Sequence, residues 1–356
     1  MSSRTLFATV WMAVAVFLCL VLYRPITTSP TTAATRPQPS PLQSATGTAS
    51  PTGTRTPASP APSPAPRTRS IRPAVDVTRL IRPERDYLGI AMDEAHKDPR
   101  QIDSFARRVG IRPNLITIYQ GFGDDFAAES VEHIYRVGAL PLVRWEPFAA
   151  PLADIAAGRH DRYVRSYARA VRRLNVPVAM TFAHEMNGFW YPWDAHHVTS
   201  SDYIAAWRRI HDIFRAEGAT NVIWCWAPNV ISGGPGVELI DWYPGDAHVD
   251  WIGIDGYFVA GGPNSYETLF GPTIREVNAF TDRPFLIVET GVEAGWLQRH
   301  RVLKSLLRGV AADDRMIGFV YFNQSGSRQW QLTGDPTALA ILAEEAKRLR
   351  YGFTVR

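Results

Sequence analysis

Between Asp161 and Ala227 the sequence reads DRYVRSYARAVRRL (161–174), PVAMTFA (177–183), SDYIAAWRRIHDIFRAE (201–217) and NVIWCWA (221–227). The first and third segments carry apolar residues at helical spacing, whereas the second and fourth are short runs rich in β-branched and aromatic residues. This alternation predicts parallel strands that are joined by right-handed helical crossovers. The stretch therefore places the chain in the α/β class.

The same alternation continues in both directions along the chain. Further strand-like runs are Tyr87–Met92, Leu115–Gln120, Leu140–Trp145, Val249–Gly256, Pro284–Glu289 and Ile317–Phe322, and further helical segments are Gln298–Val310 and Asp335–Arg350. Together these make eight strands, which is the number in a (β/α)8 TIM barrel. An open doubly wound sheet would usually show a glycine-rich phosphate-binding turn after its first strand, and Ala91-Met92-Asp93-Glu94 is no such turn. We therefore predict a TIM barrel.

The N-terminal part of the chain has a different composition. Leu6–Tyr23 is an uncharged apolar run that is just long enough to span a hydrocarbon core as a helix. A cleaved signal peptide is the alternative, although no A-x-A-like site follows this run. We expect residues 1–26 to form a signal anchor or transmembrane segment and residues 27–73 a disordered Pro/Thr/Ser/Ala-rich linker. Residues 74–356 would be the folded domain, outside the cytoplasm at the cell membrane or secreted after cleavage.

The distribution of charge argues against a nucleic acid partner. The formal net charge is +4, but seven of the 38 basic residues lie in residues 1–72, which contain no acidic residue. The rest of the chain has 31 basic against 34 acidic residues. Nucleic-acid-binding domains carry their basic patches on the folded part. With only Cys19 and Cys225, we also expect no disulfide within the folded domain, and we expect a monomer.

Carboxylates and aromatic residues gather where the predicted strands end. Glu185 follows the fourth strand and Glu289 closes the seventh. In a TIM barrel, catalytic residues lie at the C-terminal ends of the strands. Aromatic side chains near these ends, which we expect to line a binding site, include Trp145, Trp190, Trp226, Tyr257 and Trp330. Paired carboxylates among aromatic rings suit a carbohydrate site, because two carboxyl groups flank the bond that glycosidases cleave.

The segment His184-Glu185-Met186-Asn187-Gly188-Phe189-Trp190, taken with Glu289, resembles glycoside hydrolase family 26. The resemblance covers about residues 87–350. It implies a retaining endo-acting hydrolase of a β-linked polysaccharide, most often β-1,4-mannan, with Glu185 as acid/base and Glu289 as nucleophile. It also implies substrate contacts for His184 and Trp190. Asp255 and Tyr257 match the D-x-Y of the family, with Tyr257 near the nucleophile, and Trp330 would supply an aromatic platform after the eighth strand.

Several alternatives remain open at this point. His184 and Glu185 could begin the zinc motif H-E-x-x-H, but Gly188 takes the place of its second histidine, so we expect no metal and no cofactor. Arg144 and Glu146 could be substrate ligands or an internal ion pair. The substrate could instead be β-1,3/1,4-glucan or β-1,3-xylan, including the polysaccharide that the cell itself exports. A catalytically silent glycan-binding domain is a further possibility, which loss of either glutamate would have favoured.

Overall fold

The computed structural model describes residues 73–356, apart from residues 232–236 and 325–329. The predicted signal anchor, and all but the last residue of the predicted linker, lie outside the described residues. Within the part of the chain that is described, none of the helices combines the length and the apolar character that crossing a membrane requires.

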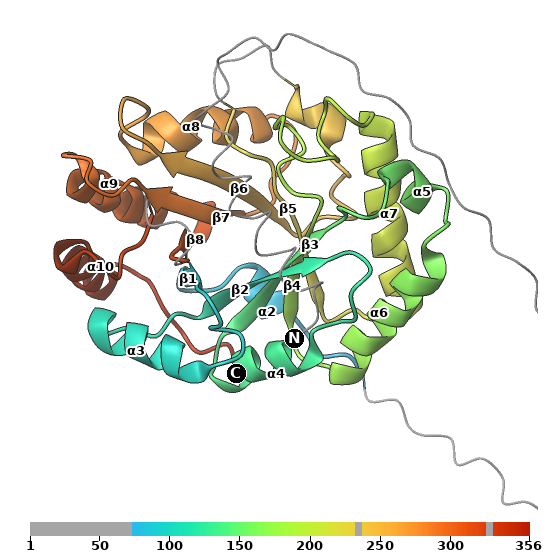
Figure 1. Cartoon of the computed structure of the whole chain (residues 1–356), viewed down its shortest axis with the longest axis horizontal. Helices are drawn as coiled ribbons and strands as arrows, with labels where there is room; N and C mark the ends of the chain where they lie inside the picture. Colours follow the sequence, from blue (N-terminus) through green and yellow to red (C-terminus); the bar gives the residue numbers. More distant parts are fainter. Residues whose placement is uncertain (1–72, 232–236, 325–329) are drawn as a thin grey trace, which may run out of the picture. The chain divides into compact units, whose positions relative to one another are not determined.

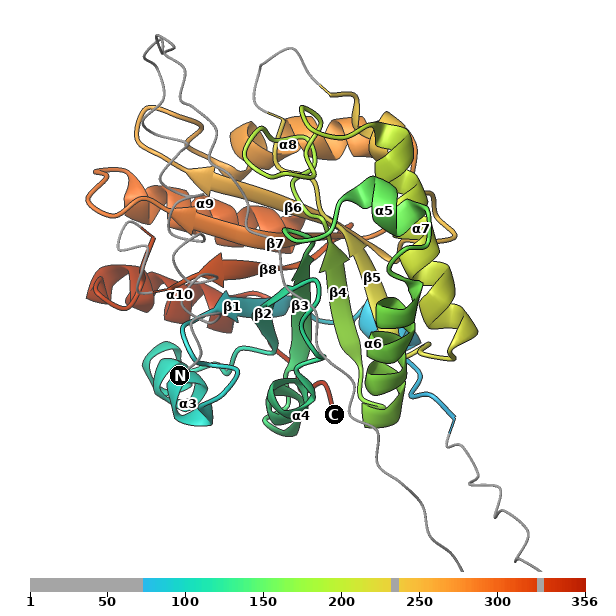
Figure 2. The same ribbon diagram turned by 45° about the vertical axis from the view of Figure 1, so that its right-hand side comes forward.

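Eight parallel strands close into a barrel (Figures 1 and 2), in which each strand pairs with the next along the chain and the last pairs with the first. The strands are β1 (Tyr87–Ala91), β2 (Leu115–Gly121), β3 (Leu140–Glu146), β4 (Val178–Phe182), β5 (Val222–Trp226), β6 (Trp251–Phe258), β7 (Phe285–Val292) and β8 (Met316–Phe322). Each of the predicted runs forms its strand, and the prediction of a TIM barrel is confirmed.

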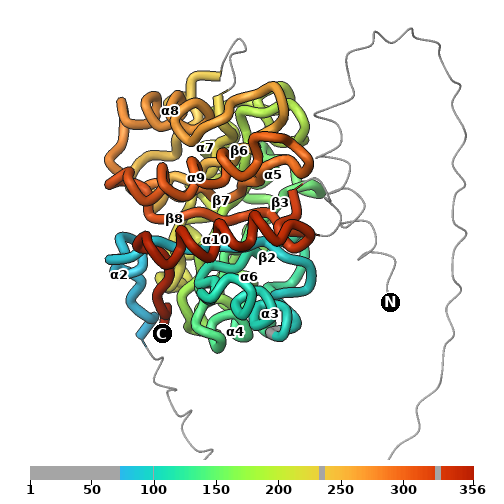
Figure 3. The backbone as a smooth tube through the Cα atoms, turned by 90° about the vertical axis from the view of Figure 1, so that its left-hand side faces the viewer, coloured from blue at the N-terminus to red at the C-terminus, as the bar shows by residue number. Residues whose placement is uncertain are grey.

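Helices surround the barrel and carry the chain from one strand to the next (Figure 1). They are α2 (Thr78–Ile81), α3 (Pro99–Val109), α4 (Ala128–Arg136), α5 (Leu152–Ala156), α6 (Asp161–Leu174), α7 (Ser200–Ala216), the 3-10 helix η1 (Leu239–Trp242), α8 (Tyr266–Val277), α9 (Arg299–Ala312) and α10 (Pro336–Arg348). The last helix, α10, contacts both α9 and α3 and so completes the outer ring (Figure 3).

Helix α6 shows how the sequence pattern produces this arrangement. Its bounds are those predicted, and its buried residues Val164, Tyr167, Ala168 and Val171 follow the spacing of one helix face. The helix ends at Asn175, which adopts the left-handed conformation common at helix C-termini. Thus α6 has one apolar face to place against the barrel and a basic face turned to solvent.

The tryptophans of β5 face the outer layer of the core. Cys225 lies inside the barrel, close to Gly253 and within the same buried cluster as Ala179 and Val288. Because successive residues of a strand point to opposite sides, Trp224 and Trp226 both point outward, toward the helices. Trp226 is fully buried beside Tyr243. The prediction that Trp226 lines the substrate site is therefore wrong, since the alternation along β5 places its ring in the hydrophobic core.

Candidate active site

Glu185 lies just beyond the C-terminal end of β4, in a segment whose backbone turns sharply. Ala183 and Glu185 have φ angles of 46° and 56°, in the left-handed region that residues with a Cβ atom seldom adopt. The Glu185 amide donates to the Ala227 carbonyl at 2.7 Å, which ties the turn to the end of β5. Strained backbone of this kind is found at functional sites, where the surrounding structure holds it in place.

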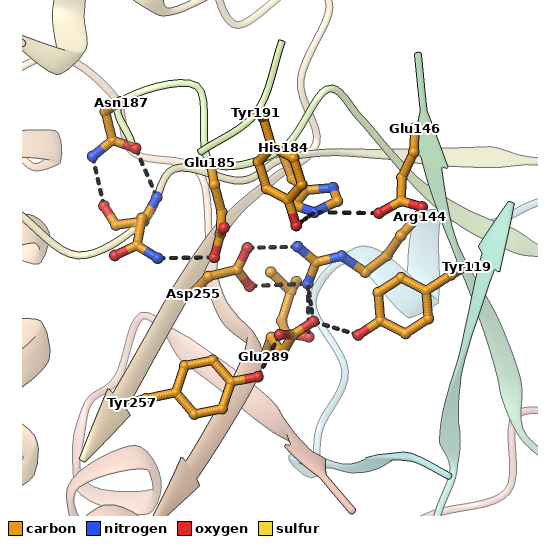
Figure 4. Close-up of polar contacts among 12 residues, drawn as sticks. Tyr119, Arg144, Glu146, His184, Glu185, Asn187, Tyr191, Asp255, Tyr257 and Glu289 are labelled. Carbon is orange, nitrogen blue, oxygen red and sulfur yellow. Dashed lines mark hydrogen bonds and ion pairs between the residues drawn. The ribbon is translucent and has the colours of Figure 1, made fainter. Parts of the chain in front are cut away.

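Two neutral donors hold the Glu185 carboxyl. The Trp190 indole Nε1 donates to Oε2 at 2.6 Å, and the Asn229 Nδ2 donates to Oε1 at 2.8 Å. Asn229 is fixed in turn by Asn187, whose side chain exchanges two hydrogen bonds of 2.8 Å with the Asn229 backbone (Figure 4). Gly188 allows this packing, because a Cβ there would lie 2.7 Å from the Trp190 ring.

Glu289 reaches the same mouth through an irregularity in β7. The pairing of β6 with β7 slips between Ile254 and Asp255, so Asp255 pairs with Glu289 and Val288 is left without a partner in the register. Val288 points into the barrel, and strict alternation would therefore have turned Glu289 outward, toward the helices. A bulge that adds one residue changes the direction of the following side chain and so brings Glu289 into the site.

The carboxylate of Glu289 has charged and hydroxyl donors, in contrast to Glu185. Tyr257 donates to Oε1 and Tyr119 donates to Oε2, both through short hydrogen bonds. Arg144 Nη1 lies 3.2 Å from Oε2 (Figure 4). One guanidinium and two hydroxyl groups thus surround the carboxylate of Glu289. This environment is suited to a nucleophile.

Arg144 lies beneath the two glutamates in a fully buried ion pair with Asp255. Nη1 and Nη2 of Arg144 lie 2.9 and 2.6 Å from the two carboxylate oxygens of Asp255, a bidentate geometry. Arg144 is therefore an ion-pair residue, but its partners are Asp255 and Glu289 and not Glu146, the partner that the sequence had suggested. Asp255 was expected to bind substrate, and that prediction is wrong, because its side chain is completely enclosed and bonded to Arg144.

Burial and neighbouring charge change the protonation of the site. Burial, with a smaller contribution from the charge of Glu289, raises the pKa of Glu185 to about 7. Burial likewise lowers the pKa of His184 well below its ordinary value, and the charge of Arg144 lowers it further. At neutral pH the site thus holds a carboxyl group that can donate a proton beside a neutral imidazole.

His184 lies beside two polar groups on one flank of the glutamates. Its Nε2 is 3.3 Å from the Tyr191 hydroxyl and 3.9 Å from Oε1 of Glu146 (Figure 4). The Tyr191 ring stacks on Trp193 at a centroid distance of 4.4 Å, and the Trp193 indole donates to the His184 carbonyl. His184 is therefore at the site, as predicted, in a position fixed by the segment after β4.

The predicted aromatic residues divide into two groups. Trp190 is half-buried at Glu185, Tyr257 bonds Glu289, and the Trp330 ring packs on Tyr257 at a centroid distance of 4.6 Å. In contrast, Trp145 is fully buried and stacks on Tyr167 of α6 at 4.3 Å. The prediction that Trp145 binds substrate is wrong, because alternation along β3 turns its ring away from Arg144 and into the outer core.

Sequence reasoning did not single out Tyr119 or Asn229. Tyr119 lies near the end of a predicted strand, so extending the search for carboxylates at strand ends to hydroxyl groups would have found it. Asn229 follows β5 after a proline, and no local signal shows that it reaches Glu185. Outside the site, His211, Asp212 and His248 form a cluster of potential metal ligands in the described part of the chain, beside Trp224 in the outer layer.

Comparison with known proteins connects this geometry to a family. Residues 158–305, which include Glu185 and Glu289, match Glycosyl hydrolase family 26. The chain is 28% identical over 256 residues to Endoglucanase H of Acetivibrio thermocellus, covering 68% of this chain and 28% of that protein. It is 31% identical over 115 residues to Mannan endo-1,4-beta-mannosidase A and B of Caldalkalibacillus mannanilyticus, covering 30% and 20% of the two chains. It thus spans less than a third of either relative.

Solved structures support the fold. A modular endo-beta-1,4-mannanase from Cellulomonas fimi superposes with a TM-score of 0.61 at 16% identity, covering 77% of this chain and 74% of that one. Because the sequence identity is low, this likeness supports the barrel architecture and not a particular substrate.

Proposed function

We propose that the chain is a retaining glycoside hydrolase that cleaves a β-linked polysaccharide, because residues 158–305 match glycosyl hydrolase family 26. Glu185 protonates the glycosidic oxygen while Glu289 attacks the anomeric carbon, and a covalent glycosyl-enzyme results. Glu185 then removes a proton from water, and the water oxygen displaces Glu289 from the sugar. The anomeric configuration is inverted twice and so retained.

The main support for these roles is the difference between the two carboxyl environments. Glu185 is buried with neutral donors, and its pKa is raised to about 7, so it can carry a proton at neutral pH. Glu289 accepts from two tyrosines and lies next to Arg144, which suits an ionised nucleophile. A pair whose environments differ in this direction is typical of acid/base and nucleophile assignments in glycosidases. It also favours an enzyme over a silent glycan-binding domain.

For the substrate we propose β-1,4-mannan first. The resemblance of the segment around Glu185 to mannanases and the mannosidase relative both support it. The longer of the two alignments is to an endoglucanase, so β-1,3/1,4-glucan is the second candidate. Digests of mannan, β-1,3/1,4-glucan and β-1,3-xylan, followed by sizing of the products, decide among these. A broad range of early products supports endo action, whereas release of one small sugar from the start contradicts it.

The two glutamates can be distinguished by chemical rescue. We expect Glu289→Ala to lower kcat by roughly 10⁴-fold or more on every substrate, because no covalent intermediate forms. Glu185→Ala should retain the first step with aryl glycosides whose leaving groups need no proton, and then accumulate the intermediate as a burst. Azide should give a β-glycosyl azide with Glu185→Ala and the α-anomer with Glu289→Ala.

A rim carboxylate provides the matched control for this experiment. Glu94 lies just after β1, is exposed, and pairs with Lys97 at 3.0 Å. Glu94→Ala should keep the parent rate and give no glycosyl azide. Swapped azide anomers would reverse the two roles. NMR of the first product shows the anomeric configuration that the unmutated enzyme releases. An inverted configuration would contradict double displacement itself.

A further inference from the structure

Glu146 is a buried carboxyl group in the site that the double-displacement steps do not use. It is the last residue of β3, and its carbonyl accepts from the Phe122 amide at 2.8 Å, which fixes its backbone. Only 7% of the residue is exposed. Figure 4 shows its carboxyl group directed toward His184, on the flank of the site where Tyr191 also lies. A side chain held in this way is placed to meet a ligand in the barrel mouth.

The protein itself leaves the Glu146 carboxyl group without a hydrogen bond among the described residues. The nearest polar contact is His184 Nε2, at 3.9 Å, which is too long for one. Arg144 lies two residues earlier on the same strand, but its guanidinium is directed to Asp255 and Glu289. The Glu146 side chain keeps 9% of its surface exposed, so a molecule bound in the barrel mouth can reach its carboxyl group.

The balance of charge determines the form in which Glu146 exists. Arg144 already neutralises Asp255 and lies beside Glu289, and His184 is neutral. A charged Glu146 would thus be buried near the negative Glu289 without a cation of its own. Burial accordingly raises the pKa of Glu146 to about 8, although the charge of Arg144 opposes the shift, and Glu289 adds to it. The group is a hydrogen-bond donor at neutral pH.

We propose that Glu146 binds the sugar whose glycosidic bond is cleaved. It does so as a neutral carboxylic acid, which donates a hydrogen bond to a ring hydroxyl beside His184 and Tyr191. The inference rests on the proposed function. It also defines a substrate class, because an uncharged hexose suits this neutral wall. A uronic acid would meet carboxyl groups there, with the guanidinium of Arg144 already engaged.

Two substitutions separate a neutral donor from a carboxylate. Glu146→Gln keeps the shape and a donor group, so kcat/KM at pH 6 should stay within about threefold of the parent value. Glu146→Ala removes the donor and should lower kcat/KM by roughly 10- to 100-fold, as for a buried hydrogen bond. Glu94→Gln is the matched control and should change nothing. Equal losses in the Gln and Ala variants would show that the carboxylate is needed, and no loss in the Ala variant would exclude contact with substrate.

Binding and stability provide readouts that do not depend on turnover. By calorimetry in a Glu185→Ala background, which slows cleavage, affinity for mannotetraose, or for cellotetraose if glucan is the substrate, should fall as the pH rises through about 8 when Glu146 is present but not with Glu146→Gln. The groups facing Glu146 are Arg144 on its own strand, His184 and Tyr191 after β4, and Glu289 on β7. Identical pH dependence of affinity in both proteins would overturn the proposal.

The stability readout follows from proton linkage. The carboxyl group binds its proton more tightly in the folded state, where its pKa is about 8, than in the unfolded state, where it is near 4.5. Its stabilising contribution is full below about 4.5 and is lost as the pH rises through 8. The Tm of Glu146→Gln should therefore rise relative to the Tm of the parent as the pH increases from 5 to 8. A Tm difference between Glu146→Gln and the parent that does not change with pH contradicts the neutral form of Glu146, even if every variant has lost turnover. Failure of the azide experiment would instead contradict the proposed function.

Discussion

At the scale of single residues, hydrogen bonds to Glu185 adjust its acidity against the effect of burial. Burial and the charge of Glu289 raise its pKa to about 7, while the charge of Arg144 and the bonds from Asn229 and Trp190 act in the opposite direction. In the proposed mechanism Glu185 must be protonated in the free enzyme, so kcat/KM should fall as the pH rises through about 7. We therefore expect Asn229 to set the pH at which kcat/KM falls, the basic limb of the pH profile, without taking part in bond cleavage.

Removal of the Asn229 side chain tests this role. We expect Asn229→Ala to raise the pKa of Glu185 further, because a bond that favours the ionised form is lost, and the basic limb of kcat/KM to move to higher pH. The proposed second step uses Glu185 as a base, so kcat should fall roughly tenfold, which corresponds to about 1.4 kcal/mol. Rates measured from pH 5 to 9 provide the check.

A buried amide elsewhere serves as the control. Asn221 precedes β5 and donates to the carbonyls of Val171 and Val176, at 3.3 and 2.7 Å. Asn221→Ala should lower stability and leave the basic limb in place. A limb that stays in place in Asn229→Ala, or that moves equally in both variants, would contradict the assigned role.

At the scale of elements, β3 shows how one strand serves two different environments. Arg144 and Glu146 point to the barrel mouth, whereas Trp145 between them packs on Tyr167 of α6 and lies near Phe214 of α7. The bulge in β7 has the opposite effect, because it brings two successive residues, Val288 and Glu289, to the same side. Strand alternation and its interruption thus decide which predicted residues reach the site.

This division predicts distinct effects for two tryptophans. Trp145→Ala should lower the free energy of unfolding by about 3–5 kcal/mol, the usual loss for a buried aromatic ring, and leave KM unchanged. Trp190→Ala should instead raise KM or remove the advantage of longer substrates, by roughly 1–3 kcal/mol as at other aromatic platforms. Urea unfolding and kinetics on oligosaccharides of increasing length measure both. A higher KM for Trp145→Ala would return that ring to the substrate site.

At the scale of the whole molecule, closure of the barrel assembles the site. Five strands contribute to it: β2 with Tyr119, β3 with Arg144, the end of β4 with Glu185, β6 with Asp255 and β7 with Glu289. Because all strands are parallel, their C-terminal ends meet at one mouth, and residues far apart in the chain come within hydrogen-bonding distance (Figure 4). The site therefore depends on the whole barrel and not on a local segment.

The location of the enzyme is a separate prediction, which rests on the apolar run Leu6–Tyr23. We propose that the full chain is a single-pass membrane protein with its barrel outside the cytoplasm. Fractionation of cells that express it should place the enzyme with the membranes, with residues 1–26 retained. Soluble product whose N-terminus begins after Tyr23 would contradict the anchor and support secretion, without affecting the catalytic assignments.

The barrel and the two glutamates follow from local features of the sequence. Helical and strand periodicity are local patterns, so they can be read without knowing what each segment packs against. The segment around Glu185 is contiguous and characteristic, and Glu289 is the last residue of the predicted seventh strand, although β7 continues beyond it to Val292.

The side chains that surround those glutamates depend on how the strands and helices pack. Trp145, Trp226 and Asp255 lie at the expected strand ends, but strand alternation and a buried arginine place them in the core or beneath the site. Tyr119 and Asn229 reach Glu289 and Glu185 across 170 and 44 residues of sequence. The register of neighbouring strands and the bulge in β7 fix such contacts, and these arise from packing among elements that no local stretch encodes.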